Sequence, residues 1–360
     1  MVRALTLAAR GVGLAHPNPI VGAVIVKNGR VVGEGFHEYD KRDHAEIVAL
    51  KQAGTKARGA TLYLTLEPCC HTARTGPCTQ AIIGAGVRRV VAAIPDPNPA
   101  VSGKGFARLR RAGIRVDTGA FEQEARGRNE DFAKWIRTGL PFVTLKAALT
   151  LDGQIAMRAG HSTPISSSPS REFVQRLRHE SDALLTGIGT ILADDPLLTD
   201  RTREPRRRKL LRVVLDSHLR LPPKSRIVKS ANDDVLVFTT EAPDSQKGRA
   251  LARPGVEVFR VRSQRGRVDL HEVMRELGRR EMLSVLLEAG AELNGAAIET
   301  GIVDKIILFY SPRIMGTGVP VARISSDSFS KRPALKNCTV KPYGEDFMLE
   351  GYFHDVCSFR

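Results

Sequence analysis

The chain has 360 residues, which is long for a single hydrophobic core and predicts two domains of ordinary size. Its composition, 42% hydrophobic and 26% charged, is typical of a globular enzyme and excludes a fibrous or disordered chain. A formal net charge of +16 favours phosphate-bearing partners, whether nucleic acid, nucleotides or a cofactor. The first fourteen residues carry only short apolar runs broken by Arg3 and Arg10. We therefore expect neither a secretory signal nor a membrane span, and a cytoplasmic location.

The first part of the chain alternates helical and extended patterns. We predict helices over 2–10, 44–53, from about 79, near 105–112 and over 122–137, and strands over 21–26, 61–66, 89–94 and 114–116. Such alternation predicts an α/β domain in which helices cover a sheet. Thr138-Gly139-Leu140-Pro141 follows the last helix, and we place the domain boundary there. This gives domains of residues 1–139 and 140–360.

A second α/β pattern follows Pro141. Strands are predicted over 142–147, 183–186, 211–215, 235–238, 283–287 and 305–309, and helices over 171–179, 270–279 and 291–299. No internal repeat makes this half a copy of the first. We therefore expect two different α/β domains.

Three residues of the first domain are of metal-ligand type. His44 begins a predicted helix, Cys69 follows a predicted strand, and Cys78 lies farther along. The chain has five cysteines, and an odd number argues against a disulfide framework and for metal or a reducing compartment. One imidazole and two thiolates supply three ligands for tetrahedral zinc and leave the fourth position for water. We interpret Cys338 and Cys357, which have no metal-like neighbours, as core thiols.

Glu46, two residues after His44, gives the predicted zinc site its chemistry. Zinc lowers the pKa of water toward about 7, so hydroxide is available to attack an amino-bearing ring carbon. Glu46 would move the water's proton to the ring nitrogen and to the departing ammonia. This order of residues is that of zinc deaminases, although the gap between the two cysteines is longer than usual. A structural zinc site with Cys70 or His71 as a further ligand is the alternative, but it leaves Glu46 unexplained.

Two strand-to-helix turns in the second domain contain glycine. One is Gly187-Ile188-Gly189-Thr190 and the other is Glu288-Ala289-Gly290-Ala291. A strand, a glycine turn and a helix start allow backbone N–H groups to approach phosphate. The same turns also serve as plain connections, so each is weak evidence alone.

Together these segments resemble one family over nearly the whole chain, the bifunctional riboflavin-biosynthesis deaminase-reductases. The segments similar to its deaminase half are His16-Pro17-Asn18-Pro19-Ile20-Val21-Gly22, His44-Ala45-Glu46, the block from Glu67 to Cys78, and Asp96-Pro97-Asn98-Pro99. Those similar to its reductase half are Lys146, Leu151-Asp152-Gly153, the block from Leu192 to Thr199, Val214-Leu215-Asp216-Ser217 and the block from Pro312 to Gly316. The resemblance implies a cytidine-deaminase-like three-layer α/β/α domain followed by a dihydrofolate-reductase-like α/β domain.

The resemblance also implies two consecutive reactions on a small pyrimidine nucleotide. The first is hydrolytic deamination of a diamino-ribosylaminopyrimidinone phosphate, with one zinc ion held by His44, Cys69 and Cys78. The second is reduction of the ribosyl group to ribityl by NADPH. Family members associate through the reductase half, so the resemblance further implies a homo-oligomer.

Residue by residue, the resemblance implies substrate contacts at Asn18, Ser162, Arg178, Leu198, Arg201 and Glu288. We expect Lys146 and Asp152 to orient the ribose that is reduced. Implied cofactor contacts are Ala148, Pro164, Thr190, Asp194, Ser217 and the turn formed by Gly290, Ala291, Glu292, Leu293, Asn294, Gly295 and Ala296. Guanidinium groups suit the phosphate of the substrate, because they form paired hydrogen bonds with its oxygens.

Pro164 departs from the family, which usually has tryptophan at this position, where the ring helps to hold the cofactor. The runner-up function is a zinc deaminase that acts on tRNA with a basic appended module. The spacing from Cys69 to Cys78 and the glycine turns of the second half disfavour it. The densest basic run, over 201–209, is interpreted as a solvated loop rather than a nucleic-acid patch.

Overall fold

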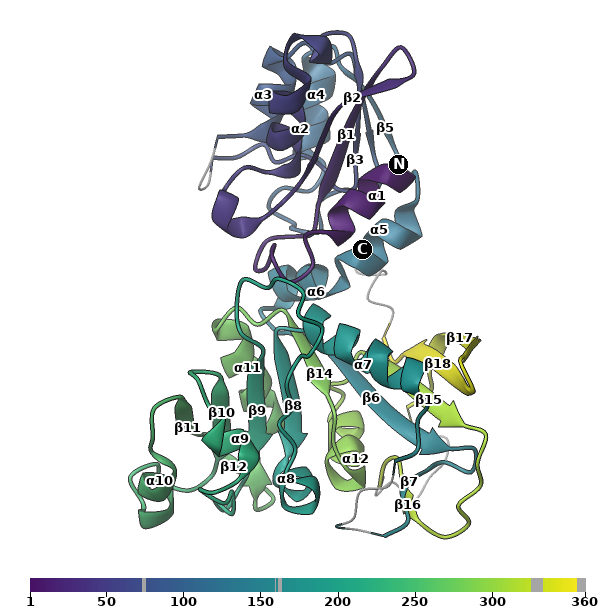
Figure 1. The fold of residues 1–360 in the computed structure, drawn as a ribbon. Helices are drawn as coiled ribbons and strands as arrows, with labels where there is room; N and C mark the ends of the chain where they lie inside the picture. Colours follow the sequence, from purple (N-terminus) through teal and green to yellow (C-terminus); the bar gives the residue numbers. More distant parts are fainter. Residues whose placement is uncertain (73–75, 159, 161–163, 325–332, 355–360) are drawn as a thin grey trace. The chain divides into compact units, whose positions relative to one another are not determined.

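The computed structural model describes residues 1–72, 76–158, 160, 164–324 and 333–354. The chain divides into two compact units (Figure 1). The first consists of Met1–Gly139 with Pro205–Arg208, and the second of Leu140–Glu204 with Lys209–Arg360. No helix of the described residues is both long and apolar enough to cross a bilayer.

In the described residues, the first unit contains a five-stranded sheet in the order β2-β1-β3-β4-β5. Its strands are β1 (Gly22–Lys27), β2 (Arg30–Phe36), β3 (Thr61–Leu64), β4 (Arg89–Ala92) and β5 (Arg115–Thr118). β1 is antiparallel to both neighbours, and β3, β4 and β5 are parallel. On one face lie α2 (Ala45–Ala53), α3 (Cys78–Gly84) and α4 (Lys104–Arg111); on the other lie α1 (Val2–Ala9) and α5 (Glu122–Arg128) (Figure 1). The unit is therefore a three-layer α/β/α domain.

Strand β2 is missing from the predicted elements because two glycines interrupt its apolar pattern. Gly33 and Gly35 lie beneath α2, with which β2 is in extensive contact. A Cβ atom added at Gly33 would lie 2.2 Å from the carbonyl oxygen of Ala49, and one added at Gly35 would lie 2.3 Å from that of Ala45. The strand therefore has glycine where the helix approaches its backbone, which removes the side chains that would have revealed it.

The helix predicted over 122–137 is two helices, α5 and α6 (Glu130–Thr138), which meet at Asn129. The Asn129 side chain accepts a hydrogen bond from the Ile20 N–H at 2.7 Å and donates one to the Ile20 carbonyl oxygen at 3.0 Å. Its backbone leaves the helical region, with φ −129° and ψ 26°. The helix is interrupted at Asn129, and the buried amide of this residue holds the distant loop that contains Ile20. The remaining short elements of this unit are the 3-10 turns η1 (Tyr39–Lys41) and η2 (Gly54–Ala57).

The second unit contains a nine-stranded sheet in its described residues, ordered β11-β10-β9-β8-β14-β6-β15-β18-β17. The strands are β6 (Phe142–Thr150), β8 (Ala183–Gly187), β9 (Leu211–Leu215), β10 (Val235–Thr239), β11 (Val256–Arg260), β14 (Ser284–Leu287), β15 (Lys305–Ser311), β17 (Lys336–Tyr343) and β18 (Asp346–Tyr352). The run from β11 to β15 is parallel, whereas β18 and β17 add an antiparallel edge. This edge hairpin was not predicted, because β17 is exposed along most of its length and lacks an apolar face. Cys338 lies on it and is exposed, so its interpretation as a core thiol is wrong; Cys357 lies outside the described residues.

Two apolar cores cover the two faces of this sheet. One core packs against α11 (Leu270–Arg279) and α12 (Ala291–Glu299), and the other against α7 (Ser168–Glu180), α9 (Arg226–Lys229) and α10 (Gln246–Leu251). Helix α8 (Ile188–Asp194) follows β8 directly. Two short pairs, β7 (Gln154–Ala156) with β16 (Val319–Pro320) and β12 (Ser263–Gln264) with β13 (Arg267–Val268), complete the described elements of the unit. The ends of β8 and β14 are thereby brought side by side.

Candidate active sites

The first site is a triangle of three donor atoms in the first unit. His44 caps the N-terminus of α2, Cys78 is the first residue of α3, and Cys69 lies in the segment after β3. Nδ1 of His44 lies 3.6 Å from Sγ of Cys69 and 3.2 Å from Sγ of Cys78, and the three atoms lie within 4.8 Å of one another. Tetrahedral zinc with ordinary bond lengths separates a nitrogen and a sulfur ligand by about 3.6 Å. The donor set therefore fits zinc.

Hydrogen bonds hold the two cysteines of this triangle together. The backbone N–H of Cys78 donates to Sγ of Cys69 at 3.3 Å, and the N–H of Thr79 donates to the Cys69 carbonyl oxygen at 3.1 Å. The Cys78 thiol also donates to Cys69, which lowers the pKa of Cys69 to about 4 and raises that of Cys78. A cation that replaces the thiol proton would bind two thiolates.

Glu46 lies in the first turn of α2 and is 4% exposed. Burial raises the pKa of Glu46, and His44 opposes this rise. Among the described residues, the group that can hold a metal consists of His44, Cys69 and Cys78 alone, so Glu46 is not a ligand of it. A buried carboxyl group beside a three-ligand site is placed to move protons.

Glu67 is a buried residue of this site to which the sequence assigned no role. Its carboxylate accepts hydrogen bonds from the N–H groups of Asp96 (3.1 Å), Gly103 (2.9 Å) and Phe106 (3.1 Å). It therefore ties the Asp96-Pro97-Asn98-Pro99 loop and the start of α4 to the segment that carries Cys69. Burial raises the pKa of Asp96 to about 6. The signal for Glu67 was its place in the Glu67-Pro68-Cys69 motif.

His37 is a second residue that the sequence did not single out. Its ring is buried edge-on against that of His44, with centroids 5.1 Å apart. Its Nε2 lies 3.0 Å from Nδ2 of Asn18, the predicted substrate contact. The His37 ring thus contacts both Asn18 and the predicted metal ligand His44. An isolated histidine after a strand gives no motif that could have predicted this.

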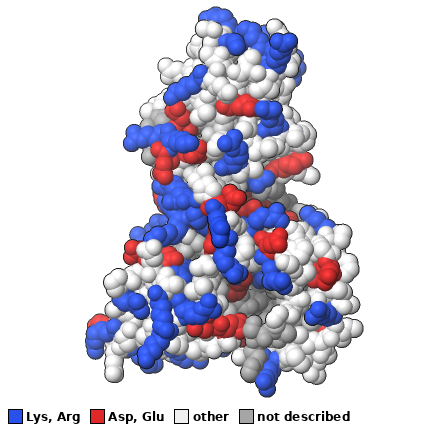
Figure 2. Space-filling view, in the orientation of Figure 1, with Lys and Arg blue, Asp and Glu red and all other residues white. Residues whose placement is uncertain are grey.

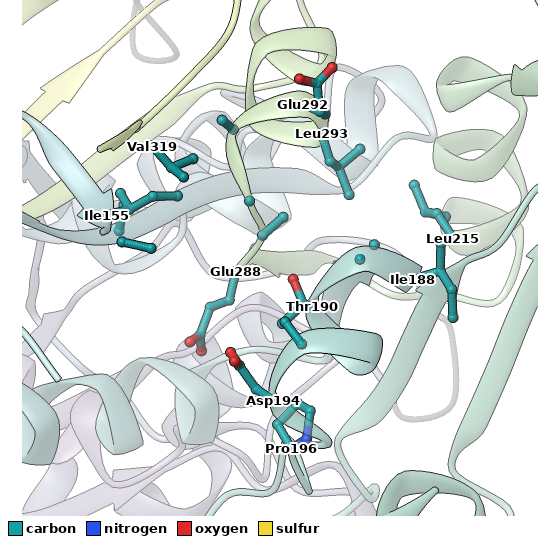
Figure 3. Close-up of a pocket in the computed structure, with 18 of the residues that line it drawn as sticks. Ile155, Ile188, Thr190, Asp194, Pro196, Leu215, Glu288, Glu292, Leu293 and Val319 are labelled. Carbon is teal, nitrogen blue, oxygen red and sulfur yellow. The ribbon is translucent and has the colours of Figure 1, made fainter. Parts of the chain in front are cut away.

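The second site is a cavity of about 860 Å³ in the second unit. It lies at the ends of β8, β9 and β14 and beside the middle of β6. Figure 3 shows Glu288 reaching it from the end of β14 while Thr190 and Asp194 extend from α8. The predicted residues that line it are Lys146, Ala148, Pro164, Arg178, Thr190, Asp194, Leu198, Ser217, Glu288, Gly290, Ala291, Glu292, Leu293 and Ala296. Residues separated by up to 150 positions in sequence therefore meet at one cavity.

A charged triad forms part of the cavity wall. Arg178 donates to both carboxylate oxygens of Glu288, at 2.8 and 3.1 Å, and Nζ of Lys146 lies 3.8 Å from the same carboxylate. Burial would raise the pKa of Glu288, but the charges of Lys146 and Arg178 hold it below its ordinary value. Burial lowers the pKa of Lys146. The Thr186 hydroxyl donates to the Glu288 carbonyl oxygen at 2.7 Å and fixes the backbone at the start of the glycine turn.

The glycine turns leave room for a cofactor. A Cβ atom added at Gly189 or Gly290 would meet no atom within 4 Å, and both residues line the cavity. Gly290 also caps the N-terminus of α12, where backbone N–H groups favour anionic groups. The cavity is further lined by His218 and by two cationic residues, Arg220 and Arg267, none of which the sequence singled out. A cavity with these features fits a phosphate-bearing dinucleotide.

The structure does not place every predicted residue at the cavity. Asp152 is exposed and does not line it; its carboxylate accepts hydrogen bonds from the Thr150 hydroxyl and the N–H groups of Met315 and Gly316. Arg201 does not line it either. Ser162 lies outside the described residues.

Two members of the turn after Glu288 face away from the cavity. Asn294 is fully buried and donates to the carbonyl oxygens of Ala289 and Val321, at 3.2 and 2.8 Å. A Cβ atom at Gly295 would lie 1.7 Å from the Arg323 carbonyl oxygen, so this glycine serves close packing. Both residues support the shape of the turn.

The basic run over 201–209 is not a uniformly solvated loop. Arg207 packs within the first unit, where its guanidinium donates to Asp40 at 2.9 Å and to the His16 carbonyl oxygen at 3.1 Å. On the face drawn in Figure 2, lysine and arginine side chains are interspersed with acidic ones. At least part of the basic run therefore has a role in packing.

Two family models match the chain. "Cytidine and deoxycytidylate deaminase zinc-binding region" matches residues 1–94, and "RibD C-terminal domain" matches residues 141–349. The riboflavin biosynthesis protein RibD of Aquifex aeolicus is 41% identical over 97% of this chain and 96% of its own length. That of Escherichia coli is 44% identical over 88% of each chain. The tRNA alternative is set aside, because these matches extend over both units.

Solved structures agree with this relationship. The structure of Acinetobacter baumannii RibD matches with a TM-score of 0.85 at 37% identity, over 98% of this chain and 97% of that one. A Thermotoga maritima structure, titled a diaminohydroxyphosphoribosylaminopyrimidine deaminase/5-amino-6-(5-phosphoribosylamino)uracil reductase, matches with the same TM-score at 38% identity and the same coverage. The predicted fold class, a cytidine-deaminase-like domain followed by a dihydrofolate-reductase-like domain, is confirmed. The chain therefore belongs to the RibD family of riboflavin-biosynthesis proteins, as a bifunctional enzyme that combines a zinc-dependent deaminase with an NADPH-dependent reductase.

Proposed function

We propose that the chain catalyses two consecutive steps on one pyrimidine nucleotide, the steps for which the Thermotoga maritima structure is titled. The first converts 2,5-diamino-6-ribosylamino-4(3H)-pyrimidinone 5′-phosphate to the corresponding uracil derivative with release of ammonia. The second gives 5-amino-6-ribitylaminouracil 5′-phosphate. We assign the first step to residues 1–139 and the second to residues 140–360. The observation that carries the proposal is the donor triangle of His44, Cys69 and Cys78 with buried Glu46 beside it.

In the deamination, His44, Cys69 and Cys78 would hold zinc, and Glu46 moves protons. Zinc, when bound, acts as a Lewis acid that makes hydroxide available at neutral pH. The Glu46 carboxylate takes one proton from the attacking water and delivers it to the ring nitrogen; it then takes the second proton, from the hydroxyl group of the addition product, and delivers it to the departing amine. Burial suits Glu46 to this role, because it raises the pKa of the carboxyl group toward the working pH. Asn18 contacts the pyrimidine ring.

In the reduction, the charged triad positions the ribose and its phosphate. NADPH supplies the hydride. Arg178 binds the substrate, and its two hydrogen bonds to Glu288 fix the position of its guanidinium group. Nζ of Lys146, whose pKa is lowered by burial, gives a proton to the ribose oxygen as the ring opens to the aldehyde level. Arg201, outside the described cavity wall, is proposed to reach the phosphate from its rim.

The remaining roles follow from the cavity wall and from the family. Substrate contacts include Leu198 and Ser162, and Asp152 supports the loop beside the ribose. NADPH contacts are Ala148, Pro164, Thr190, Asp194, Ser217 and the wall-lining members of the turn after Glu288, with Asn294 and Gly295 shaping that turn. We place the enzyme in the cytoplasm, and we propose that copies associate through the reductase unit.

A two-stage assay tests the proposal. The purified zinc-loaded chain is incubated with the diaminopyrimidinone nucleotide, first without NADPH and then with it. We expect ammonia without NADPH, and NADPH oxidation only after ammonia has been released. Ammonia from tRNA but not from the nucleotide, or NADPH oxidation with no prior deamination, would contradict the proposed order of steps.

A further inference from the structure

His37 is a buried imidazole whose two ring nitrogens both have partners. It directly follows β2, is 3% exposed, and its backbone N–H donates to the Val21 carbonyl oxygen at 3.1 Å. Nδ1 lies 3.0 Å from the backbone carbonyl oxygen of Asp43, and Nε2 lies 3.0 Å from Nδ2 of Asn18. The edge-on contact with His44 fixes the plane of the ring. His37 therefore connects the helix start that carries a metal ligand to the loop that carries Asn18.

The Asp43 contact determines which nitrogen of His37 carries the proton. A backbone carbonyl oxygen only accepts hydrogen bonds, so Nδ1 must donate. In a neutral imidazole, Nε2 is then an acceptor, and its partner must be a donor. The amide of Asn18 meets this need only when its NH₂ group faces His37. The tautomer of one residue thus fixes the amide orientation of another.

The backbone around Asn18 is held independently of His37. The Asn18 N–H donates to the Ala15 carbonyl oxygen at 3.0 Å. Both backbone polar groups of Ile20 are bonded to the buried Asn129 side chain. Nε2 of His16 lies 3.2 Å from the Asp131 carboxylate. These contacts fix the backbone of the loop. His37 therefore affects mainly the orientation of the Asn18 side-chain amide.

We propose that His37 is a positioning residue for deamination, which makes Asn18 present its carbonyl oxygen, a hydrogen-bond acceptor, to the pyrimidine ring. This inference rests on the proposed function of the first unit. Oδ1 of Asn18 has no hydrogen-bond partner among the described residues, so it is available to a ligand. The opposite orientation would present a donor instead.

An acceptor at this position selects the class of ring. In a 2-aminopyrimidinone, the carbon that carries the amino group lies between an unprotonated ring nitrogen and a ring N–H. In cytosine, the corresponding carbon lies between an unprotonated nitrogen and a C–H. Asn18 Oδ1 can accept from the N–H, while Glu46 protonates the nitrogen on the other side. The His37–Asn18 pair therefore favours amidine-type pyrimidinones over cytosine.

The tautomer is tested directly by ¹⁵N NMR of the imidazole groups in the zinc-loaded chain at neutral pH, with the His37 signals assigned from their loss in His37→Asn. We expect Nδ1 of His37 to be protonated and Nε2 not, and we expect Asn18→Ala to move the Nε2 signal. The opposite tautomer, or no effect of Asn18→Ala, would overturn the proposal. Because this measurement needs no substrate, it stands even if the chain releases no ammonia from the nucleotide, a result that would contradict the proposed function instead.

Kinetics of two His37 variants test the consequence for the substrate. Asn in His37→Asn can retain the bond to the Asp43 carbonyl but leaves Asn18 without a partner, so we expect KM for deamination to rise about tenfold, or about 1.4 kcal/mol. The glutamine of His37→Gln reaches farther and can accept from Asn18, and should restore part of this loss. His271→Asn, at an exposed position of α11, is the matched control and should change nothing. An unchanged KM in zinc-loaded His37→Asn would overturn the proposal, and so would zinc loss in both variants, because His37 would then support His44 rather than Asn18.

Discussion

The deaminase site and the reductase site are built on different scales. The donor triangle uses three atoms within 4.8 Å of one another, contributed by residues that span 44 to 78. The reductase cavity, about 860 Å³ in volume, collects its wall from residues that span 146 to 323. A metal site depends on a few atoms, so loss of one should be decisive. A cofactor cavity spreads its contacts, so loss of one should be graded.

Removal of a metal ligand should give the largest effect. Cys78→Ser should abolish zinc binding and ammonia release and should destabilise the first unit, because the fully buried thiolate joins α3 to the triangle. Metal analysis, ammonia release and thermal unfolding measure this. Reduction of the deaminated intermediate is the control and should persist, and a chelator should reproduce the result in the native chain. Full zinc occupancy in the variant would move the third ligand to Cys70 or His71.

Replacement of Glu46 separates proton transfer from metal binding. Glu46→Gln should lower the rate of ammonia release by about 10²–10⁴-fold, since the amide cannot carry the proton. Zinc content should not change, because Glu46 is outside the group of potential ligands. Zinc loss, or deamination at the native rate, would count against the assigned role.

In the reductase cavity, Arg178→Ala should weaken substrate binding by about 1.5–3 kcal/mol, the range for lost charge-assisted bonds. The variant also leaves the buried Glu288 carboxylate with Lys146, at 3.8 Å, as its remaining ion-pair partner among the described residues. Arg201→Ala should weaken substrate by less, because Arg201 is exposed. Calorimetric titration of the deaminated intermediate measures both, with Arg171→Ala on the exposed part of α7 as control. Equal weakening of NADPH binding would mean that these arginines hold the cofactor instead.

Pro164→Trp should strengthen NADPH binding by enlarging the contact surface of one cavity wall. Pro164 lines it, and an indole offers a broader aromatic face than the proline ring. We expect a severalfold tighter dissociation constant for NADPH by fluorescence titration, with deamination unchanged. If the native chain binds NADPH as tightly as the variant, another residue already supplies this wall.

A separate effect concerns Asp96 and the stability of the first unit rather than its activity. Its pKa is raised by burial from an ordinary value of 3.8 to about 6 in the folded state. The folded state therefore binds the proton more tightly than the unfolded state, and the first unit should gain stability as pH falls from about 6 toward 4, by at most about 3 kcal/mol. Asp96→Asn keeps an acceptor for the Asn98 N–H, should stabilise this unit at pH 7, and should flatten its pH dependence. Chemical denaturation measures the unfolding free energy at each pH. If this free energy depends more steeply on pH in the variant than in the native chain, burial of Asp96 is not the cause of the dependence.

The sequence by itself determined the two α/β domains and the family, and it predicted the three residues of metal-ligand type that the structure brings together. These features depend on local periodicity and on short motifs, in which Glu46 follows His44 by two residues and Cys69 follows a strand. Only the tertiary structure decided which members of those motifs face a site. Asp152 accepts hydrogen bonds from the N–H groups of Met315 and Gly316, and Asn294 donates to the Val321 carbonyl oxygen. Both side chains are therefore held by partners distant in sequence and not by the cavity. The same reason explains the residues that no motif revealed. Glu67 and His37 act through backbone groups and side chains that come together only when the strands and helices pack.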